Sequence, residues 1–205
     1  RSMRQGERWA QMGSQKRKEA ALRGIAFRGI FHGLEADNMR LIIHDLDSGS
    51  LERLGSGQPA EVHVISPDSG PIHHCLGCFG CWVKTPGACV IADSYSGLGE
   101  LFSRCSEVDI ITRCLYGGYS PFVKNVLDRS ISYMQPFFTI KDGEMRHKRR
   151  YHNRVRLRVI FYGDITPEEE ETARGFAQAN AVNLGWELAS VSFYRDLAGV
   201  EGWVL

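Results

Sequence analysis

From residue 39 onward, short apolar runs alternate with longer stretches of helical periodicity. The apolar runs at 41–44, 61–66, 108–114, 157–162 and 187–193 are typical of strands. Helices are predicted over 120–133, 166–185 and 96–105, and the first two begin with a capping Ser or Thr followed by Pro. The segment 46–57 is rich in Gly and Ser, so it predicts no more than about two helical turns.

This alternation predicts an α/β fold in which a parallel sheet is covered by helices on both faces. Five strands in about 165 residues fit a flavodoxin-like, doubly wound five-stranded sheet with strand order 2-1-3-4-5 and three layers, α/β/α. Ligands of such sheets bind beyond the carboxyl ends of the strands, at the switch between strands one and three. We therefore expect the chemistry in the loops 44–50, 66–93, 113–121 and 162–166.

Residues 1–38 do not share this pattern, since they show no strand alternation and only a weak helical pattern over 20–31. Met39 would be a natural initiator and opens the first apolar run. We expect 1–38 to be a poorly ordered N-terminal extension, and 39–205 to be the domain. An organelle-targeting peptide is disfavoured because Glu7 and Glu19 interrupt the basic residues and Ser is sparse.

The net charge of +1 hides an uneven distribution. Residues 1–38 hold 8 basic and 4 acidic side chains, 141–158 hold 8 and 2, and the remainder holds 9 and 18. A hydrophobic content of 43% and a charged content of 24% are typical of globular proteins. No apolar run approaches a membrane span or a signal peptide, so we expect a cytoplasmic protein with no membrane partner.

Four cysteines form a compact motif, Cys75-x2-Cys78-x2-Cys81-x7-Cys89. Disulfides are disfavoured in what otherwise reads as an intracellular enzyme, and structural zinc usually takes two separated Cys-x2-Cys pairs. The spacing suits a [4Fe–4S] cluster better, because one short loop can wrap three corners of the cube. A buried thiol loop without metal, anchored by Phe79 and Trp82, stays open as an alternative.

The third predicted strand ends in the loop CLYGGYSP at 114–121. Glycines just beyond a strand let a flat ligand approach the backbone, the following helix offers free N–H groups, and tyrosines can stack on a ring. Taken alone, the loop also fits a tight strand-to-helix turn with no ligand.

The stretches 75–93 (CLGCFGCWVKTPGACVIAD) and 114–130 (CLYGGYSPFVKNVLDRS) resemble the NAD(P)H-dependent FMN reductase family, and the resemblance covers 39–195 in element order. The cysteine motif is similar to that of a subgroup, the iron-sulfur flavoproteins. The resemblance implies FMN as cofactor, NAD(P)H as co-substrate, and electron transfer to a quinone, a flavin or another small acceptor without a catalytic side chain. The implied cofactor-binding residues are Tyr116, Gly117, Gly118, Tyr119, Ser120, Gly163 and Asp164, and the implied cluster ligands are Cys75, Cys78, Cys81 and Cys89.

The basic segment lies within an insertion at about 136–153, before the fourth predicted strand. In the resembling family this insertion is similar to a dimer-forming arm, which implies a homodimer or homotetramer, or contact with the phosphates of a dinucleotide. A solvated charged face stays open as an alternative. Nucleic-acid binding is disfavoured, because Arg154, Arg156 and Arg158 alternate with apolar residues and place part of the charge at an exposed strand start.

One loop departs from the family pattern. After the first strand the sequence reads HDLDSGS at 44–50, where Asp45 and Asp47 would repel a phosphate unless they point away or pair with a cation. Ser48 and Ser50 remain candidate phosphate donors, with Lys84 or Arg113 as sources of positive charge. Three hypotheses follow: an FMN-dependent oxidoreductase, an iron-sulfur flavoprotein electron carrier, and a cofactor-free binding module.

Overall fold

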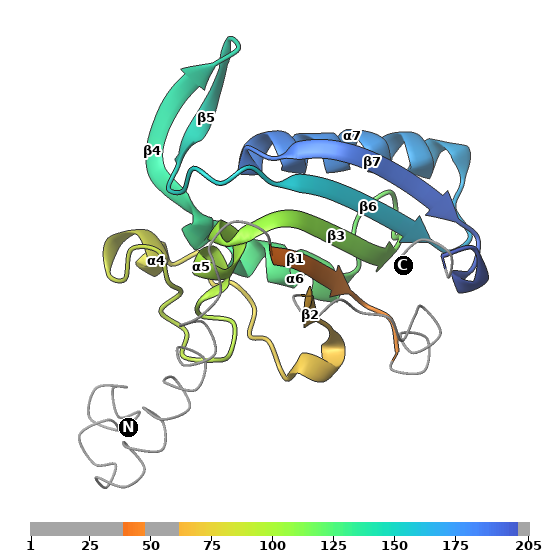
Figure 1. Ribbon diagram of the computed structural model, residues 1–205, viewed down its shortest axis with the longest axis horizontal. Helices are drawn as coiled ribbons and strands as arrows, with labels where there is room; N and C mark the ends of the chain where they lie inside the picture. Colours follow the sequence, from red (N-terminus) through yellow and green to blue (C-terminus); the bar gives the residue numbers. More distant parts are fainter. Residues whose placement is uncertain (1–38, 48–61, 201–205) are drawn as a thin grey trace, which may run out of the picture. The chain divides into compact units, whose positions relative to one another are not determined.

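The computed structural model describes residues 39–47 and 62–200. Five parallel strands form one sheet in the order β2-β1-β3-β6-β7 (Figure 1). They are β1 (Met39–His44), β2 (Val62–Ile65), β3 (Cys105–Arg113), β6 (Arg156–Tyr162) and β7 (Glu187–Tyr194). Counted within this sheet alone, the order is 2-1-3-4-5, so the predicted flavodoxin-like topology is confirmed.

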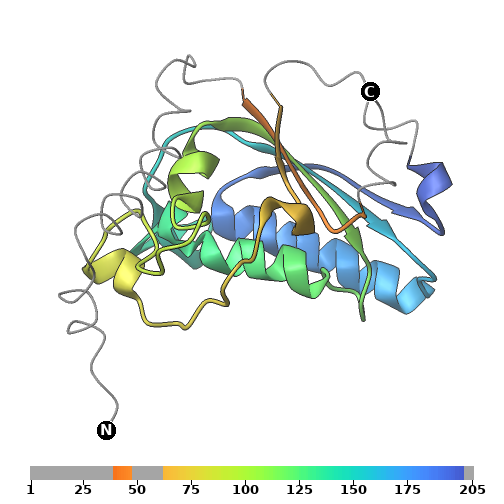
Figure 2. The ribbon, with the colours of Figure 1, turned by 90° about the horizontal axis from the view of Figure 1, so that it is seen from below.

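The three predicted helices are α5 (Leu98–Ser103), α6 (Pro121–Arg129) and α7 (Pro167–Leu184). Figure 2 shows α6 and α7 side by side on one face of the sheet. The capping box of α7 forms as predicted, because Thr166 and Glu169 each accept a backbone hydrogen bond from the other. Gly185 ends the helix in the left-handed conformation, with φ of 69°. The buried stripe of α7 consists of alanines, which let the helix lie close to the sheet: Ala173, Ala177 and Ala181.

The face of the sheet opposite α6 and α7 carries an ion-pair network at one end and an apolar cluster at the other. Asp109 is 2% exposed and binds Arg40 and Arg158 from the neighbouring strands, each at 2.6 Å. Arg158 was predicted at an exposed strand start, but it is half-buried because Asp109 and Glu107 pair with it. The apolar cluster consists of Ile42, Leu46, Ile111, Ile160 and Val200.

A two-stranded antiparallel hairpin extends away from the sheet (Figure 1). It consists of β4 (Met134–Lys141) and β5 (Glu144–Arg149), joined by Asp142 and Gly143 with φ of 54° and 81°. The sequence predicted an inserted arm here but no strands. The missed signal was the Asp-Gly pair, which is favoured in two-residue hairpin turns with positive φ.

Shorter elements complete the described chain: η1 (Pro67–Ser69), α4 (Gly80–Val83), η2 (Ile131–Tyr133) and η3 (Leu197–Gly199). The predicted extension at 1–38, most of the predicted short helix at 46–57, and the candidate phosphate donors Ser48 and Ser50 lie outside the described residues. Within the described part of the chain, none of the helices combines the length and apolar character that a membrane crossing requires.

Candidate functional site

The carboxyl ends of β1, β3 and β6 meet at one edge of the sheet, and the Asp45 carboxylate joins them. It accepts hydrogen bonds from Thr112 Oγ1 (3.0 Å), the Arg113 backbone N–H (2.9 Å) and the Tyr162 hydroxyl (3.0 Å). Burial raises the pKa of Tyr162 and the nearby Asp45 charge raises it further, so this hydroxyl keeps its proton and donates. Asp45 therefore points at the strand ends and is held by three donors.

The loop after β3 forms a tight two-residue turn at this edge. Leu115 and Gly118 exchange two backbone hydrogen bonds of 3.0 and 2.9 Å, and Tyr116 and Gly117 between them both have positive φ. A Cβ on Gly117 would lie 2.6 Å from the Thr172 side chain of α7, so only glycine fits there. The turn thus packs against the first turns of α7 and leaves the Tyr116 side chain 92% exposed.

Two further residues predicted to line the ring, Tyr119 and Ser120, use their side chains within the fold. Tyr119 is buried, stacks on Phe161 at 5.6 Å and contacts Phe176 at 4.9 Å. Ser120 caps α6 by accepting a hydrogen bond from Val123, while its own N–H donates to Thr112 Oγ1. Both side chains are thus occupied in packing and capping, and their predicted place beside the ring stays a prediction.

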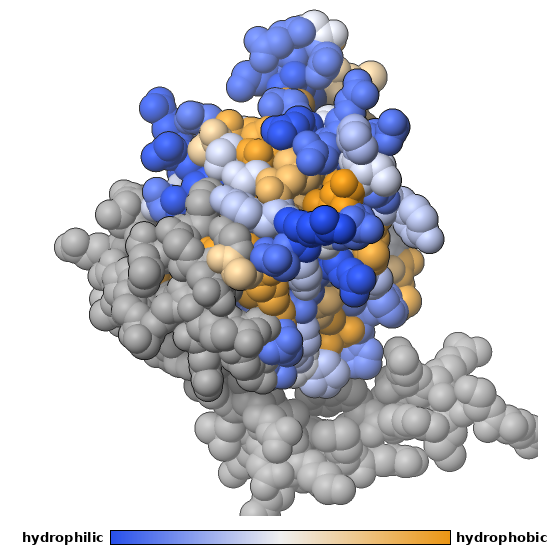
Figure 3. All heavy atoms as spheres, turned by 90° about the vertical axis from the view of Figure 1, so that its right-hand side faces the viewer, coloured by the Kyte–Doolittle hydropathy of each residue, from blue (hydrophilic) through white to orange (hydrophobic). Residues whose placement is uncertain are grey.

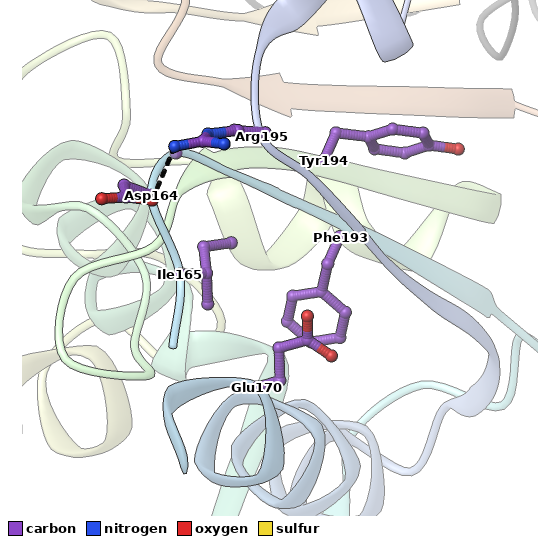
Figure 4. A pocket seen from close by; sticks show the side chains of 7 residues that line it. Asp164, Ile165, Glu170, Phe193, Tyr194 and Arg195 are labelled. Atoms are coloured by element: carbon purple, nitrogen blue, oxygen red, sulfur yellow. Dashed lines mark ion pairs between the residues drawn. The ribbon is translucent and has the colours of Figure 1, made fainter. Parts of the chain in front are cut away.

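Gly163 and Asp164 line a separate cavity of about 280 Å³ between the ends of β6 and β7 and the start of α7 (Figure 4). Gly163 has φ of 122°, and its N–H donates to the Tyr194 carbonyl at 3.0 Å. The Asp164 carboxylate pairs with Arg195 at 3.8 Å on the surface. This cavity and the 115–118 turn both touch the first turns of α7, so the two predicted walls flank that helix start.

Figure 3 looks onto this carboxyl edge, where hydrophobic side chains reach the surface between hydrophilic ones.

The four cysteines of the motif line one small cavity of about 110 Å³. Gly77 and Phe79, which flank Cys78, both have positive φ, of 61° and 53°, and so bend the backbone within the motif. Cys81 lies buried on α4, while Cys75 and Cys78 are exposed and Cys89 is half-buried. Burial raises the pKa of Cys81, and the other three cysteines lie near enough to raise it further. The remaining lining residues are Leu76, Gly77, Phe79, Ile91, Arg129 and Ile131.

Arg129 forms the charged part of this cavity wall, and its side chain is fully buried. Its Nη1 and Nη2 donate to the two carboxylate oxygens of Asp93, at 2.8 and 2.7 Å, and Nη1 also donates to the His73 carbonyl at 2.7 Å. Its buried Nε has no hydrogen-bond partner among the described residues. Burial alone would lower the pKa of Arg129, but Asp93 and the neighbouring Cys89 outweigh it and raise the pKa.

Sequence reasoning missed Arg129 and Asp93 as site residues. The available signal was Arg129 itself, which follows Val123 and Val126 at intervals of three on the buried side of α6. A charged residue on such a face calls for a buried partner, because an unpaired buried charge is costly.

Trp82 connects the cysteine loop to the hairpin. Its indole Nε1 donates to the Met134 carbonyl at 3.0 Å and to the Ile131 carbonyl at 3.2 Å. Its ring stacks on Phe79 at 5.3 Å and packs against His147 of β5 at 5.0 Å. Trp82 thus anchors the loop, whereas Phe79 stacks on it with its own side chain 60% exposed, so the pair is not the buried anchor that the sequence suggested.

The spacing of the four thiols distinguishes between a single zinc ion and a [4Fe–4S] cluster as the group that they could bind. Over residues 39–47 and 62–200, no three His, Cys, Asp or Glu side chains converge closely enough to hold a single metal ion. A zinc ion requires such convergence, since its thiolate ligands all lie about 2.3 Å from one point. A [4Fe–4S] cluster spreads its four thiolates over the corners of a cube and needs space between them. A cavity bordered by four cysteines fits the second requirement better than the first.

Comparison with known proteins identifies the fold. No family model matches the sequence, and no curated protein matches it. Among solved structures, the azoreductase AzrA matches with a TM-score of 0.53 and 9% identity, over 81% of this chain and 96% of that chain. An FMN-dependent NADH-azoreductase from Bacillus anthracis str. Ames Ancestor, in complex with FMN, matches with a TM-score of 0.52 and 11% identity, over 80% and 93%. At these identities the likeness shows the fold, so the resemblance seen in the sequence is confirmed at that level.

The described residues fit the ring end of an FMN molecule. Tyr116 offers an exposed aromatic ring at the carboxyl edge, and an added Cβ on Gly163 would approach only the Arg113 side chain, at 3.8 Å. The Asp45 carboxylate is held by three neutral donors on β3 and β6. Whether Asp45 and Asp47 tolerate a phosphate stays a prediction. The phosphate end of the site depends on 48–50, outside the described residues.

Proposed function

We propose that this chain is an FMN-dependent NAD(P)H oxidoreductase that passes electrons to a quinone, a flavin or another small acceptor. The observation that supports it most is the pair of loops, 115–118 and 163–165, at the carboxyl edge of a sheet whose fold is shared with an azoreductase in complex with FMN. When bound, FMN would supply the hydride and electron transfer.

The chain's own residues would bind and orient that cofactor. Tyr116 would cover one side of the ring, the glycine at 163 would allow close approach, and backbone N–H groups of the two loops would contact its polar edge. None of these roles requires a side chain that exchanges a proton with substrate.

The test is an absorbance spectrum of anaerobically purified protein, followed by titration with FMN and an assay of NAD(P)H oxidation with a quinone. We expect flavin absorbance or a saturable change in FMN fluorescence, and FMN-dependent oxidation of NAD(P)H. A colourless protein that leaves FMN fluorescence unchanged would contradict the proposal and favour a cofactor-free binding module.

A second candidate function is that of an iron-sulfur flavoprotein, with a [4Fe–4S] cluster on Cys75, Cys78, Cys81 and Cys89. The cavity that all four cysteines line favours it, together with the buried Arg129 in its wall. Such a cluster would add one-electron transfer to the two-electron chemistry of a flavin.

Anaerobic reconstitution with iron and sulfide tests this candidate. We expect a brown protein with iron bound, loss of iron in Cys78→Ala, and retention of iron in Cys114→Ser, a control at a cysteine outside the motif. Wild-type protein that binds no iron after reconstitution would reject the cluster and leave the first candidate standing.

We also propose that two copies of the chain associate through the hairpin. Its exposed apolar side chains, among them Phe137, Ile140 and Met145, are typical of an interface rather than of a surface facing water. The basic residues beside them are complementary to the acidic first turn of α7 in a second copy, which contains Glu168, Glu169 and Glu170.

A further inference from the structure

The four-cysteine cavity has a polar wall that thiols alone do not explain. A loop of neutral thiols could be closed by apolar residues, as Ile91 and Ile131 do on other sides of the same cavity. Instead, the side chain of Arg129 reaches the cavity from α6 with none of its surface exposed to solvent. A buried N–H without an acceptor calls for an explanation, and a ligand is one of those established. Among the described residues the Nε atoms of Arg146 and Arg149 are also unpaired, but of the three arginines Arg129 is the one that lines the four-cysteine cavity.

The direction of the free N–H follows from how Arg129 is held. Asp93 takes both terminal nitrogens of the guanidinium in a bidentate pair, and the His73 carbonyl takes a further bond from Nη1. That geometry is rigid, because the guanidinium is planar and two parallel bonds fix its orientation. The Nε atom makes no hydrogen bond of regular geometry, while Cys89, on the wall of the same cavity, lies close enough to Arg129 to act as an acceptor for its side chain.

We infer that Arg129 is a positioning and tuning residue for the cluster, whose Nε–H donates a hydrogen bond to a cluster sulfur or to the Cys89 thiolate while Asp93 holds the guanidinium in place. The inference rests on the proposed cluster and assigns to it a residue outside the cysteine motif. A cationic donor beside an iron-sulfur cluster stabilises the state that has accepted one electron, because that state is one charge more negative. Arg129 should therefore raise the reduction potential.

The experiment measures the reduction potential of the reconstituted, full-length protein by anaerobic titration with dithionite, followed by the visible spectrum and by electron paramagnetic resonance. The main variant is Arg129→Gln combined with Asp93→Asn, which removes both charges together and leaves no buried carboxylate unpaired. Its matched control is Lys124→Gln with Asp128→Asn, which removes an ion pair of the same kind from the exposed side of the same helix, α6. A further variant, Arg129→Lys, keeps the charge but lacks Nε.

We expect the Arg129 and Asp93 double variant to bind the same amount of iron as the wild type and to shift the reduction equilibrium at least tenfold toward the oxidised cluster, which is about 59 mV for one electron. Arg129→Lys should shift in the same direction by less, and the Lys124 and Asp128 control should not shift. If the double variant does not bind iron, the reduction potential of Arg129→Lys tests the role of Arg129.

The outcomes separate the inference from the function beneath it. A loaded Arg129→Lys or double variant with an unchanged potential overturns the role of Arg129 while the cluster stands. Wild-type protein that takes up no iron overturns the cluster proposal itself, and the inference with it. An equal shift in the exposed control would show a general effect of charge and would also overturn the specific role.

Discussion

At the scale of single residues, neighbours in sequence have opposite roles at the carboxyl edge. Tyr116 has positive φ and points into solvent, whereas Tyr119, three residues later, stacks in the core on Phe161. The close packing of Gly117 against Thr172 fixes the turn and thereby separates the two rings. Tyr116 is therefore the aromatic residue of this loop that is free to contact a ligand.

Replacing Tyr116 with Ser should weaken FMN binding about five- to tenfold, since an aromatic stacking contact is worth about 1 kcal/mol. The free energy of unfolding should change by less than about 0.5 kcal/mol, because the side chain is exposed. Fluorescence titration with FMN and urea denaturation measure the two effects. Val83→Ser, at a similarly exposed apolar residue away from this edge, is the control and should change neither. Equal FMN affinity in wild type and Tyr116→Ser would show that the ring lies elsewhere.

Asp93 should make stability depend on pH in the acid range. Burial would raise its pKa, but hydrogen bonds and charge from Arg129 lower it below that of the unfolded chain. The unfolded state therefore takes up the proton first, so this contribution is present above about pH 4 and is lost as the pH falls through the folded-state pKa. Asp93→Asn should be less stable at pH 7 and should lose less stability on acidification. Denaturation curves from pH 7 to pH 3 measure this, with Asp128→Asn as the exposed control, and parallel curves for wild type and Asp93→Asn would contradict it.

At the scale of elements, the ion network on the sheet links three strands. Asp109 of β3 is buried between Arg40 of β1 and Arg158 of β6, so one carboxylate pairs with two cations, and Glu107 supplies the second negative charge. Removing it would leave two arginines facing each other with only Glu107 nearby. The network therefore makes the central strands depend on a single side chain.

Asp109→Ala should destabilise the fold by about 3 kcal/mol, as expected when one partner of a buried ion pair is lost. Asp128→Ala, which breaks the exposed pair with Lys124, should cost less than about 1 kcal/mol. Guanidinium denaturation of both variants provides the comparison. Similar losses in the two variants would mean that the buried network contributes no more than a surface pair.

The sequence predicted the elements whose burial imposes a regular pattern. The parallel strands are buried on both faces, so they read as apolar runs, and α6 and α7 carry clear capping residues. The hairpin was missed because its strands are exposed and β5 is almost entirely polar, which removes the alternation that marks a half-buried strand. The pairing of Arg129 with Asp93 was missed because it joins segments 36 residues apart, and no local pattern indicates which buried carboxylate meets which cation.

At the scale of the whole molecule, the hairpin is an arm that exposes apolar side chains away from the sheet. Ile140 and Met145 face each other across the two strands and are 77% and 72% exposed. An isolated two-stranded hairpin is marginally stable in water, so a second copy of the chain would also stabilise the arm.

Replacing Ile140 and Met145 together with Ser should convert a dimer, or a larger assembly, into monomers. Analytical ultracentrifugation of the full chain measures this, and Val83→Ser, exposed on the cysteine loop, should leave the assembly intact. A monomeric wild type, or a double variant that sediments like the wild type, would place the interface elsewhere.

The contacts of Trp82 give the molecule a built-in optical reporter. Its indole ring lies between Phe79 of the cysteine loop and His147 of the arm, and its N–H is tied to the backbone where the arm begins. Any event that repacks the loop or moves the arm must therefore change the polarity around this indole. Cluster assembly and self-association, which are chemically unrelated, would both change the emission of this side chain. With the other three tryptophans of the chain replaced by Phe, the order of the two events could be followed without a label.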